Sequence, residues 1–192
     1  MGDNATCLDL DDFSIGNAHL DLLDTLKQAI PDLKVTLFTV PLPFDKPYSL
    51  SQSLEFIRTV KIDRPWVEFA LHGWQHTRLE CQAWTLEQTQ RVLLTIEHTG
   101  LFVHGFKAPY WELCPAVYHA VNRQGWWIAD HERNQQMRPP GTRVYLLDRP
   151  ERVHGHVQDI GSNGLKEAWA TYVALRGPFK FVSEIMAAEV VR

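Results

Sequence analysis

The segment His72-Gly-Trp-Gln-His76 carries two imidazoles four residues apart, directly after the apolar run Val67–Leu71. A strand that ends in the first histidine can aim both rings at one point if the chain turns at Gly73, because glycine permits tight turns. The segment lacks the glutamate of the helical His-Glu-x-x-His zinc motif, so the pair is expected on a strand end and the following loop. Two unrelated histidines in an exposed loop are the alternative for this segment alone.

A second strand-like run, Cys7–Leu10, ends in the adjacent carboxylates Asp11 and Asp12. Neighbouring residues on a strand point to opposite faces, so both can serve one site only if the strand bends or ends there. One carboxylate could then bind a metal ion while the other accepts a proton; a solvated acidic turn is the alternative. Asp9, on the same strand, is expected to point inward near the floor of the sheet. Two histidines and one carboxylate suffice for a catalytic divalent ion with a position open for water, which predicts a metal-dependent hydrolase.

Three further strand ends carry polar groups. Lys107 ends an apolar run and could pair with a carboxylate and keep it ionised. Tyr110 and Trp111 follow and could line a pocket, or equally pack beneath a helix. Asp130 ends the run Trp126–Ala129 and is interpreted as a partner of Lys107.

The segment Arg152-Val-His-Gly-His-Val157 places His154 and His156 two residues apart, hence on one face of a strand. Either histidine could protonate a leaving amine, because the imidazole pKa suits proton transfer near neutrality. A third metal ligand is the other possibility for these side chains.

The elements that must position these residues alternate along the chain, which indicates βαβ units and a parallel sheet. Seven or eight strands predict an α/β fold, a closed or nearly closed barrel formed by one domain over residues 1–192, with its chemistry at the carboxyl ends of the strands. The strands are expected at 6–11, 35–40, 67–72, 102–107, 126–130, 143–147, 152–157 and 179–183, and the helices at 17–30, 50–60, 85–98, 115–123 and 165–176.

The composition of the chain argues against two classes of binding partner, nucleic acids and membranes. The 192-residue chain is 45% hydrophobic with a net charge of −4 and no basic patch, which argues against nucleic acid. No apolar run approaches the roughly 20 residues needed to cross a bilayer, so no membrane partner is predicted. Three cysteines without CxxC spacing indicate free thiols in a reducing compartment. The N-terminus lacks the pattern of a signal peptide, so a cytoplasmic location is expected. No oligomeric state is predicted.

Taken in order, these motifs resemble those of the polysaccharide deacetylase family, carbohydrate esterase family 4. The family's Thr-Phe-Asp-Asp-Gly is similar to residues 9–13, and its His-Ser/Thr-x-x-His to residues 72–76. Its Arg-x-Pro-Tyr/Trp is similar to residues 107–110, its fourth motif to Asp130, and its fifth to Val153–His156. The chain departs from the pattern at Phe13, which replaces glycine, and at Lys107, which replaces arginine and loses its bidentate fork.

The resemblance implies a distorted (β/α) barrel of about seven to eight mostly parallel strands. It implies a divalent ion, most simply Zn²⁺, on Asp12, His72 and His76, with Asp11 as the general base. The expected reaction is removal of an N-acetyl or other acyl group from an acylated sugar or polysaccharide.

The remaining roles follow from the same resemblance. Lys107 would orient the base and be tethered in turn by Asp130, and His154 or His156 would be the acid. The expected substrate contacts are Tyr110 and Trp111. Two other functions stay open: a non-catalytic carbohydrate-binding barrel, and a deacylase of esters or non-sugar amides.

Overall fold

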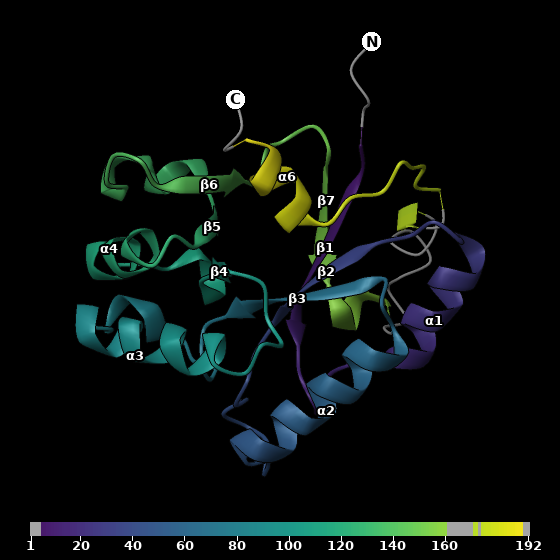
Figure 1. Cartoon of the computed structure of the whole chain (residues 1–192), viewed down its shortest axis with the longest axis horizontal. Helices are drawn as coiled ribbons and strands as arrows, with labels where there is room; N and C mark the ends of the chain where they lie inside the picture. Colours follow the sequence, from purple (N-terminus) through teal and green to yellow (C-terminus); the bar gives the residue numbers. More distant parts are fainter. Residues whose placement is uncertain (1–4, 161–170, 173, 190–192) are drawn as a thin grey trace.

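The computed structural model describes residues 5–160, 171–172 and 174–189. In this part of the chain, seven strands form one parallel sheet in the order β6-β5-β4-β3-β2-β1-β7. The strands are β1 (Cys7–Phe13), β2 (Val35–Thr39), β3 (Val67–His72), β4 (Gly105–Lys107), β5 (Trp127–Asp130), β6 (Arg143–Leu146) and β7 (Arg152–His156). The sheet curls into a half-barrel, which confirms the expected distorted (β/α) barrel (Figure 1).

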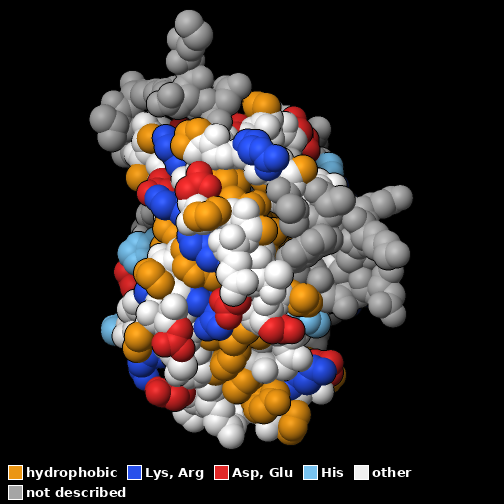
Figure 2. All heavy atoms as spheres, turned by 90° about the vertical axis from the view of Figure 1, so that its right-hand side faces the viewer, with side chains coloured by type: hydrophobic (Ala, Val, Ile, Leu, Met, Phe, Trp, Pro, Cys, Tyr) orange, Lys and Arg blue, Asp and Glu red, His pale blue; other side chains and the backbone are white. Residues whose placement is uncertain are grey.

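In the described part of the chain, helices cover the outer, convex side of the curled sheet (Figure 1). They are α1 (Leu20–Ala29), α2 (Leu50–Asp63), α3 (Leu86–Glu97) and α4 (Pro115–Arg123). Capping boxes begin α2 at Ser49 and α3 at Thr85, and a proline opens α4, so local sequence accounts for these three starts. On the face seen in Figure 2, acidic and basic side chains are interspersed with hydrophobic ones.

Strand alternation divides the side chains between two environments. Leu8 and Leu10 face outward into the main hydrophobic core beneath the helices. Cys7 faces inward to a smaller apolar cluster that also contains Phe38 and Tyr145. The inner face therefore also receives Asp9 and Asp11 of β1. Because the strands are parallel, their carboxyl ends all lie at one end of the half-barrel.

Helix α6 (Val182–Ala188) lies at the other end, where the strands begin. Thr36 Oγ1 accepts the backbone N–H of Val182 at 3.0 Å, and Glu68 Oε1 accepts that of Ser183 at 3.1 Å. The expected strand at 179–183 is wrong, because Phe179 makes only an isolated bridge to Thr6 and these buried oxygens instead satisfy the first turn of α6. The helix expected at 165–176 falls mostly outside the described residues.

The three cysteines are free thiols, as expected. Burial raises the pKa of Cys7 to about 12 and that of Cys81 well above its ordinary value, so both thiols are unreactive near neutral pH. Within the described residues, no helix is long and apolar enough to cross a membrane.

Candidate metal-binding active site

Asp12, His72 and His76 meet at the carboxyl end of β1 and β3. Asp12 Oδ1 lies 2.8 Å from His76 Nε2 and 3.3 Å from His72 Nε2. The three candidate ligand atoms all lie within 4.8 Å of one another. Asp12 Oδ1 is buried and has no hydrogen-bond partner among the described residues. A buried carboxylate oxygen that faces two imidazole nitrogens fits a divalent cation.

The backbone departs from regular strand geometry both at Asp12 and in the loop that carries His76. The register between β1 and β2 shifts between Leu10 and Phe13, and Asp12 adopts the left-handed conformation with φ 65°. This irregularity lets the adjacent carboxylates Asp11 and Asp12 serve one site, as a regular strand would not. His76 also has a positive φ of 62°, and Gly73 has 63°. Strained backbone of this kind concentrates at functional sites.

The loop between the two histidines is held by Glu80, which sequence analysis missed. Its carboxylate accepts the backbone N–H groups of Trp74, Gln75 and His76 at 3.0, 2.8 and 3.0 Å. His72 Nδ1 lies 3.1 Å from the carbonyl oxygen of Lys107, which can only accept, so Nδ1 donates and Nε2 is left for a ligand. A glutamate four to six residues after a turn is a common pattern, so the sequence carries no specific signal for Glu80.

The electrostatics of the trio favour an ionised carboxylate. Burial opposes ionisation of Asp12, but the His72 and His76 imidazoles that face its carboxylate, together with the hydrogen bond from Gln158 to Oδ2, outweigh it and hold the pKa of Asp12 below its ordinary range. Burial also opposes the charge on His76, yet the nearby Asp12 carboxylate raises the His76 pKa overall. The site therefore attracts positive charge.

Lys107 and Asp11 form a buried ion pair through Nζ and Oδ2. Their side chains are only 1% and 6% exposed, so the pair is nearly removed from water. Burial lowers the pKa of Lys107, although the charges of Asp11 and Asp9 oppose that effect. Oδ1 of Asp11 is buried and has no hydrogen-bond partner among the described residues, which leaves it available to a water or a substrate group.

Asp9 and Arg152 form a second buried pair, which sequence analysis did not predict. Arg152 Nε donates to Asp9 Oδ2 at 2.7 Å, and its Nη2 donates to Asp9 Oδ1 at 2.9 Å. Asp9 Oδ1 also lies 2.8 Å from His154 Nδ1. The inward direction expected for Asp9 is confirmed, since its side chain is fully buried on the inner face of β1.

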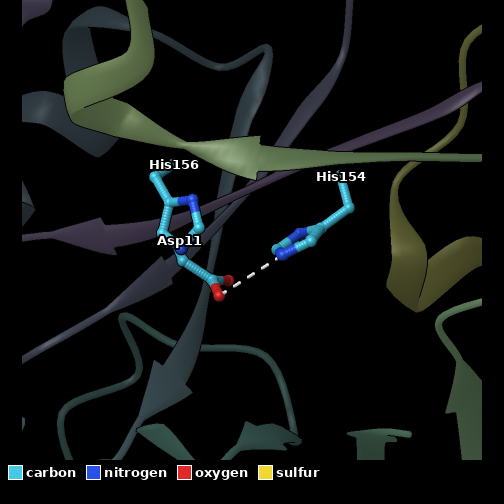
Figure 3. A group of neighbouring side chains, drawn as sticks. All are labelled: Asp11, His154 and His156. Carbon is cyan, nitrogen blue, oxygen red and sulfur yellow. Dashed lines mark ion pairs between the residues drawn. The ribbon is translucent and has the colours of Figure 1, made fainter. Parts of the chain in front are cut away.

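Asp11, His154 and His156 form a second group that could coordinate a metal, shown in Figure 3. Asp11 Oδ2 lies 3.6 Å from His154 Nε2, along the dashed line. The Lys107 ammonium pairs with the same Oδ2 and lies 3.3 Å from the same Nε2. A cation already lies between these atoms, so a second metal ion is disfavoured here.

His154 and His156 differ in their surroundings. The side chain of His154 is 18% exposed and faces Asp11 and Lys107. His156 is 44% exposed, and its Nδ1 lies 3.3 Å from Asp159 at the outer edge of the group. Of the two candidates for the acid, His154 is therefore the one that lies against Asp11.

Asp130 does not contact Lys107, and the expected tether is corrected. In register, Lys107 pairs with Ala129, so Asp130 points to the opposite, outer face of the sheet. There Asp130 Oδ2 accepts from Tyr118 Oη at 2.6 Å and from Arg138 Nε at 2.8 Å. Asp130 thus joins α4 to the loop after β5.

Tyr110 and Trp111 lie beside the group formed by Asp12, His72 and His76. Tyr110 is 52% exposed and its ring centroid is 5.1 Å from that of His76. The Trp111 ring covers the Lys107 ammonium at 3.9 Å. A pocket of about 200 Å³ over the site is bordered by both residues. It shares Asp12, His76 and Tyr110 with a cavity of about 580 Å³, large enough for a sugar unit.

No protein-family model and no curated protein sequence matches the chain. Among solved structures, the chitin deacetylase from the fungal pathogen Colletotrichum lindemuthianum is 18% identical, with a TM-score of 0.60 over 96% of this chain and 88% of that one. The Xyl-CE4 domain of a multidomain xylanase from the hindgut metagenome of Trinervitermes trinervoides is 15% identical, with a TM-score of 0.57 over 100% and 93% of the two chains. A pseudoenzyme of the CE4 family from Bacillus anthracis is 13% identical, with a TM-score of 0.60 over 96% and 66%. These likenesses show that the chain has the polysaccharide deacetylase fold.

Proposed function

We propose that the protein is a metal-dependent hydrolase that removes an acyl group, most simply N-acetyl, from an acylated sugar or polysaccharide. The observation that carries the proposal is the unpartnered, buried Asp12 Oδ1 facing the Nε2 atoms of His72 and His76. These three residues would hold the ion, and Zn²⁺ suits two imidazoles and a carboxylate. When bound, the ion supplies Lewis-acid activation of a water molecule and of the acyl carbonyl.

The protein residues supply the proton transfers. Asp11 takes a proton from the attacking water, and the Lys107 ammonium, paired with its Oδ2, holds that carboxylate in place. The proton that Asp11 takes passes to Nε2 of His154, which lies 3.6 Å from Asp11 Oδ2. As the C–N bond breaks, His154 gives this proton from Nε2 to the departing nitrogen, and the site returns to its starting state.

The substrate would be held by the aromatic walls and the larger cavity. Trp111 covers the Lys107 ammonium in the small pocket, and Tyr110 lines both that pocket and the larger cavity. Phe44, at the rim of the cavity, is 72% exposed and offers an apolar face to a sugar ring. Fold similarity to the two carbohydrate-active proteins named above supports an acylated sugar as substrate.

Metal reconstitution combined with an acetate-release assay tests this function. Protein stripped by a chelator and reloaded with Zn²⁺, Co²⁺ or Mn²⁺ should bind one ion per chain and release acetate from N-acetylated chito-oligosaccharides. Asp12→Asn should lose both the ion and the activity, because one of three ligands is replaced.

Two outcomes would redirect the proposal. Bound metal without release from any acylated sugar would favour a carbohydrate-binding barrel, as the likeness to a CE4 pseudoenzyme allows. Release from simple esters or non-sugar amides alone would indicate a different deacylase. Failure of the reconstituted protein to retain any ion would overturn the metal assignment.

A further inference from the structure

Arg152, Asp9 and His154 form a continuous chain of hydrogen bonds behind the active site. Asp9 accepts two bonds from Arg152, at 2.7 and 2.9 Å, and lies 2.8 Å from His154 Nδ1. The side chains of Asp9 and Arg152 are fully buried. Asp9 of β1 and His154 of β7 are register partners in the parallel sheet, so the two strands fix the positions of these side chains relative to each other.

The hydrogen bonds among Arg152, Asp9 and His154 determine which nitrogen of His154 carries a proton. Burial disfavours an ionised Asp9, but the charge of Arg152 and the hydrogen bonds from His154 and Arg152 keep the Asp9 pKa below its ordinary range. An ionised carboxylate can only accept, so His154 Nδ1 must be the N–H donor. Nε2 is thereby turned toward the reaction site, 3.6 Å from Asp11 Oδ2 and 3.3 Å from Lys107 Nζ.

Arg152 holds the carboxylate in place. Its guanidinium donates hydrogen bonds to both carboxylate oxygens of Asp9 and another to the Tyr145 carbonyl oxygen at 3.4 Å. It lies 4.7 Å from the Tyr145 ring centroid and 5.5 Å from that of Trp111. Such a bidentate, stacked arginine leaves Asp9 a single orientation.

We propose that Asp9, locked by Arg152, is the positioning residue for His154: it fixes the Nδ1–H tautomer, aims Nε2 at the departing nitrogen and stabilises the imidazolium. This inference rests on the proposed acyl hydrolysis and adds two residues to it. Among the described residues, the charged and titratable groups that contact His154 are Asp9 and Asp11 from β1, Lys107 from β4 and His156 from β7, and Arg152 contacts Asp9 behind them. Only Asp9 accepts from Nδ1 among the described residues.

Leaving-group dependence separates positioning of an acid from general structural support. An amide nitrogen must be protonated as it departs, whereas 4-nitrophenolate leaves without a proton. Asp9→Asn should therefore lower kcat for an N-acetylated chito-oligosaccharide by about tenfold or more, toward the ~10²–10⁴-fold loss of His154→Gln, with little change in KM. Hydrolysis of 4-nitrophenyl acetate by the same variant should change by no more than about twofold.

A double-mutant cycle adds a second readout. If Asp9 acts through His154, the variant that carries both Asp9→Asn and His154→Gln is no slower than His154→Gln alone. Losses that add would overturn the proposal. Asp130→Asn is the matched control, because Asp130 is an equally buried aspartate paired with an arginine on the outer face. Any rate loss in that control should be the same for the amide and the ester.

Two further measurements separate the positioning role of Asp9 from the effect of leaving Arg152 without its counter-ion. Asp9→Asn leaves Arg152 buried without its counter-ion, so a variant with Asp9→Asn and Arg152→Gln, which removes both charges, should reproduce the same ratio of amide to ester activity. Nitrogen NMR of the imidazoles reads the tautomer without any turnover. Wild-type His154 should be the Nδ1–H form, and Asp9→Asn should shift it toward Nε2–H.

The outcomes distinguish this inference from the proposed function. A wild-type protein that releases no acetate but shows the fixed Nδ1–H form would refute the hydrolase and support the positioning by Asp9. An active wild type with an unchanged tautomer and unchanged amide rate in Asp9→Asn would refute the positioning alone.

Discussion

Asp11 and Asp12 are adjacent in the chain but lie in different environments. Asp12 faces two imidazoles, whereas Asp11 pairs with the buried Lys107 ammonium. One carboxylate is therefore suited to hold a cation and the other to accept a proton, and the bulge that ends β1 makes both uses possible. Pairs of titratable groups in unlike environments are the usual means of dividing such roles.

Asp11→Asn tests this division at the residue scale. The variant should retain its metal ion, because Asp12, His72 and His76 are unchanged, and should lose roughly 10²–10⁴-fold in kcat, because the proton acceptor is gone. Metal analysis and acetate release measure the two effects, with the exposed Asp21→Asn as control. Turnover at the wild-type rate would show that Asp11 is not the base.

At the scale of elements, the positions of the proposed metal ligands His72 and His76 depend on the loop after β3 more than on β3 itself. His72 ends the strand, but His76 lies four residues beyond it, in a turn with positive φ at Gly73 and at His76. A Cβ at position 73 would lie 2.7 Å from Pro109 Cγ, so glycine is required for space as well as for conformation. Glu80 then fixes the turn by accepting three consecutive N–H groups.

Glu80→Ala should weaken metal binding without touching a ligand. Three backbone N–H groups lose their acceptor, the turn loosens and His76 is no longer held in position, so we expect about a 10–100-fold rise in the dissociation constant for Zn²⁺. Competition with a chromophoric chelator gives this constant. Glu87→Ala, on the exposed face of α3, is the matched control. Equal affinities of Glu80→Ala and wild type would exclude this role.

At the scale of the whole molecule, the half-barrel carries the candidate site at one end, and α6 closes the other end. Glu68 is buried at the closed end and accepts from Thr36 Oγ1 at 2.7 Å as well as from the first turn of α6. Burial raises its pKa above the ordinary 4.5, although hydrogen bonds from Ser183 and Thr36 oppose that effect. The docking of α6 is thereby linked to a protonation equilibrium.

This linkage predicts a pH-dependent difference between wild type and Glu68→Gln. The folded state holds the Glu68 proton more tightly than the unfolded state does. The resulting contribution to stability is complete below the unfolded-state pKa of 4.5 and is lost as the pH rises through the folded-state pKa. Because Glu68→Gln cannot titrate, wild type should lose stability relative to it by up to about 1.4 kcal/mol per pH unit across that window.

Urea unfolding at a series of pH values measures the difference. The comparison of wild type with Glu87→Gln, an exposed glutamate, should show no such trend above about pH 4.5. A difference between wild type and Glu68→Gln that stays constant over the whole range would contradict the linkage.

The sequence alone predicted the alternating elements, because hydrophobic periodicity and helix caps are local properties. It also predicted that Asp12, His72 and His76 lie together, because the carboxyl ends of parallel strands share one end of a barrel. It could not determine partners that depend on strand register. Asp130 ends a strand just as Lys107 does, yet their register places them on opposite faces. Asp9 meets Arg152 and His154 across more than 140 residues because β7 returns beside β1. The short α6 likewise depends on buried oxygens from β2 and β3, which no local pattern contains.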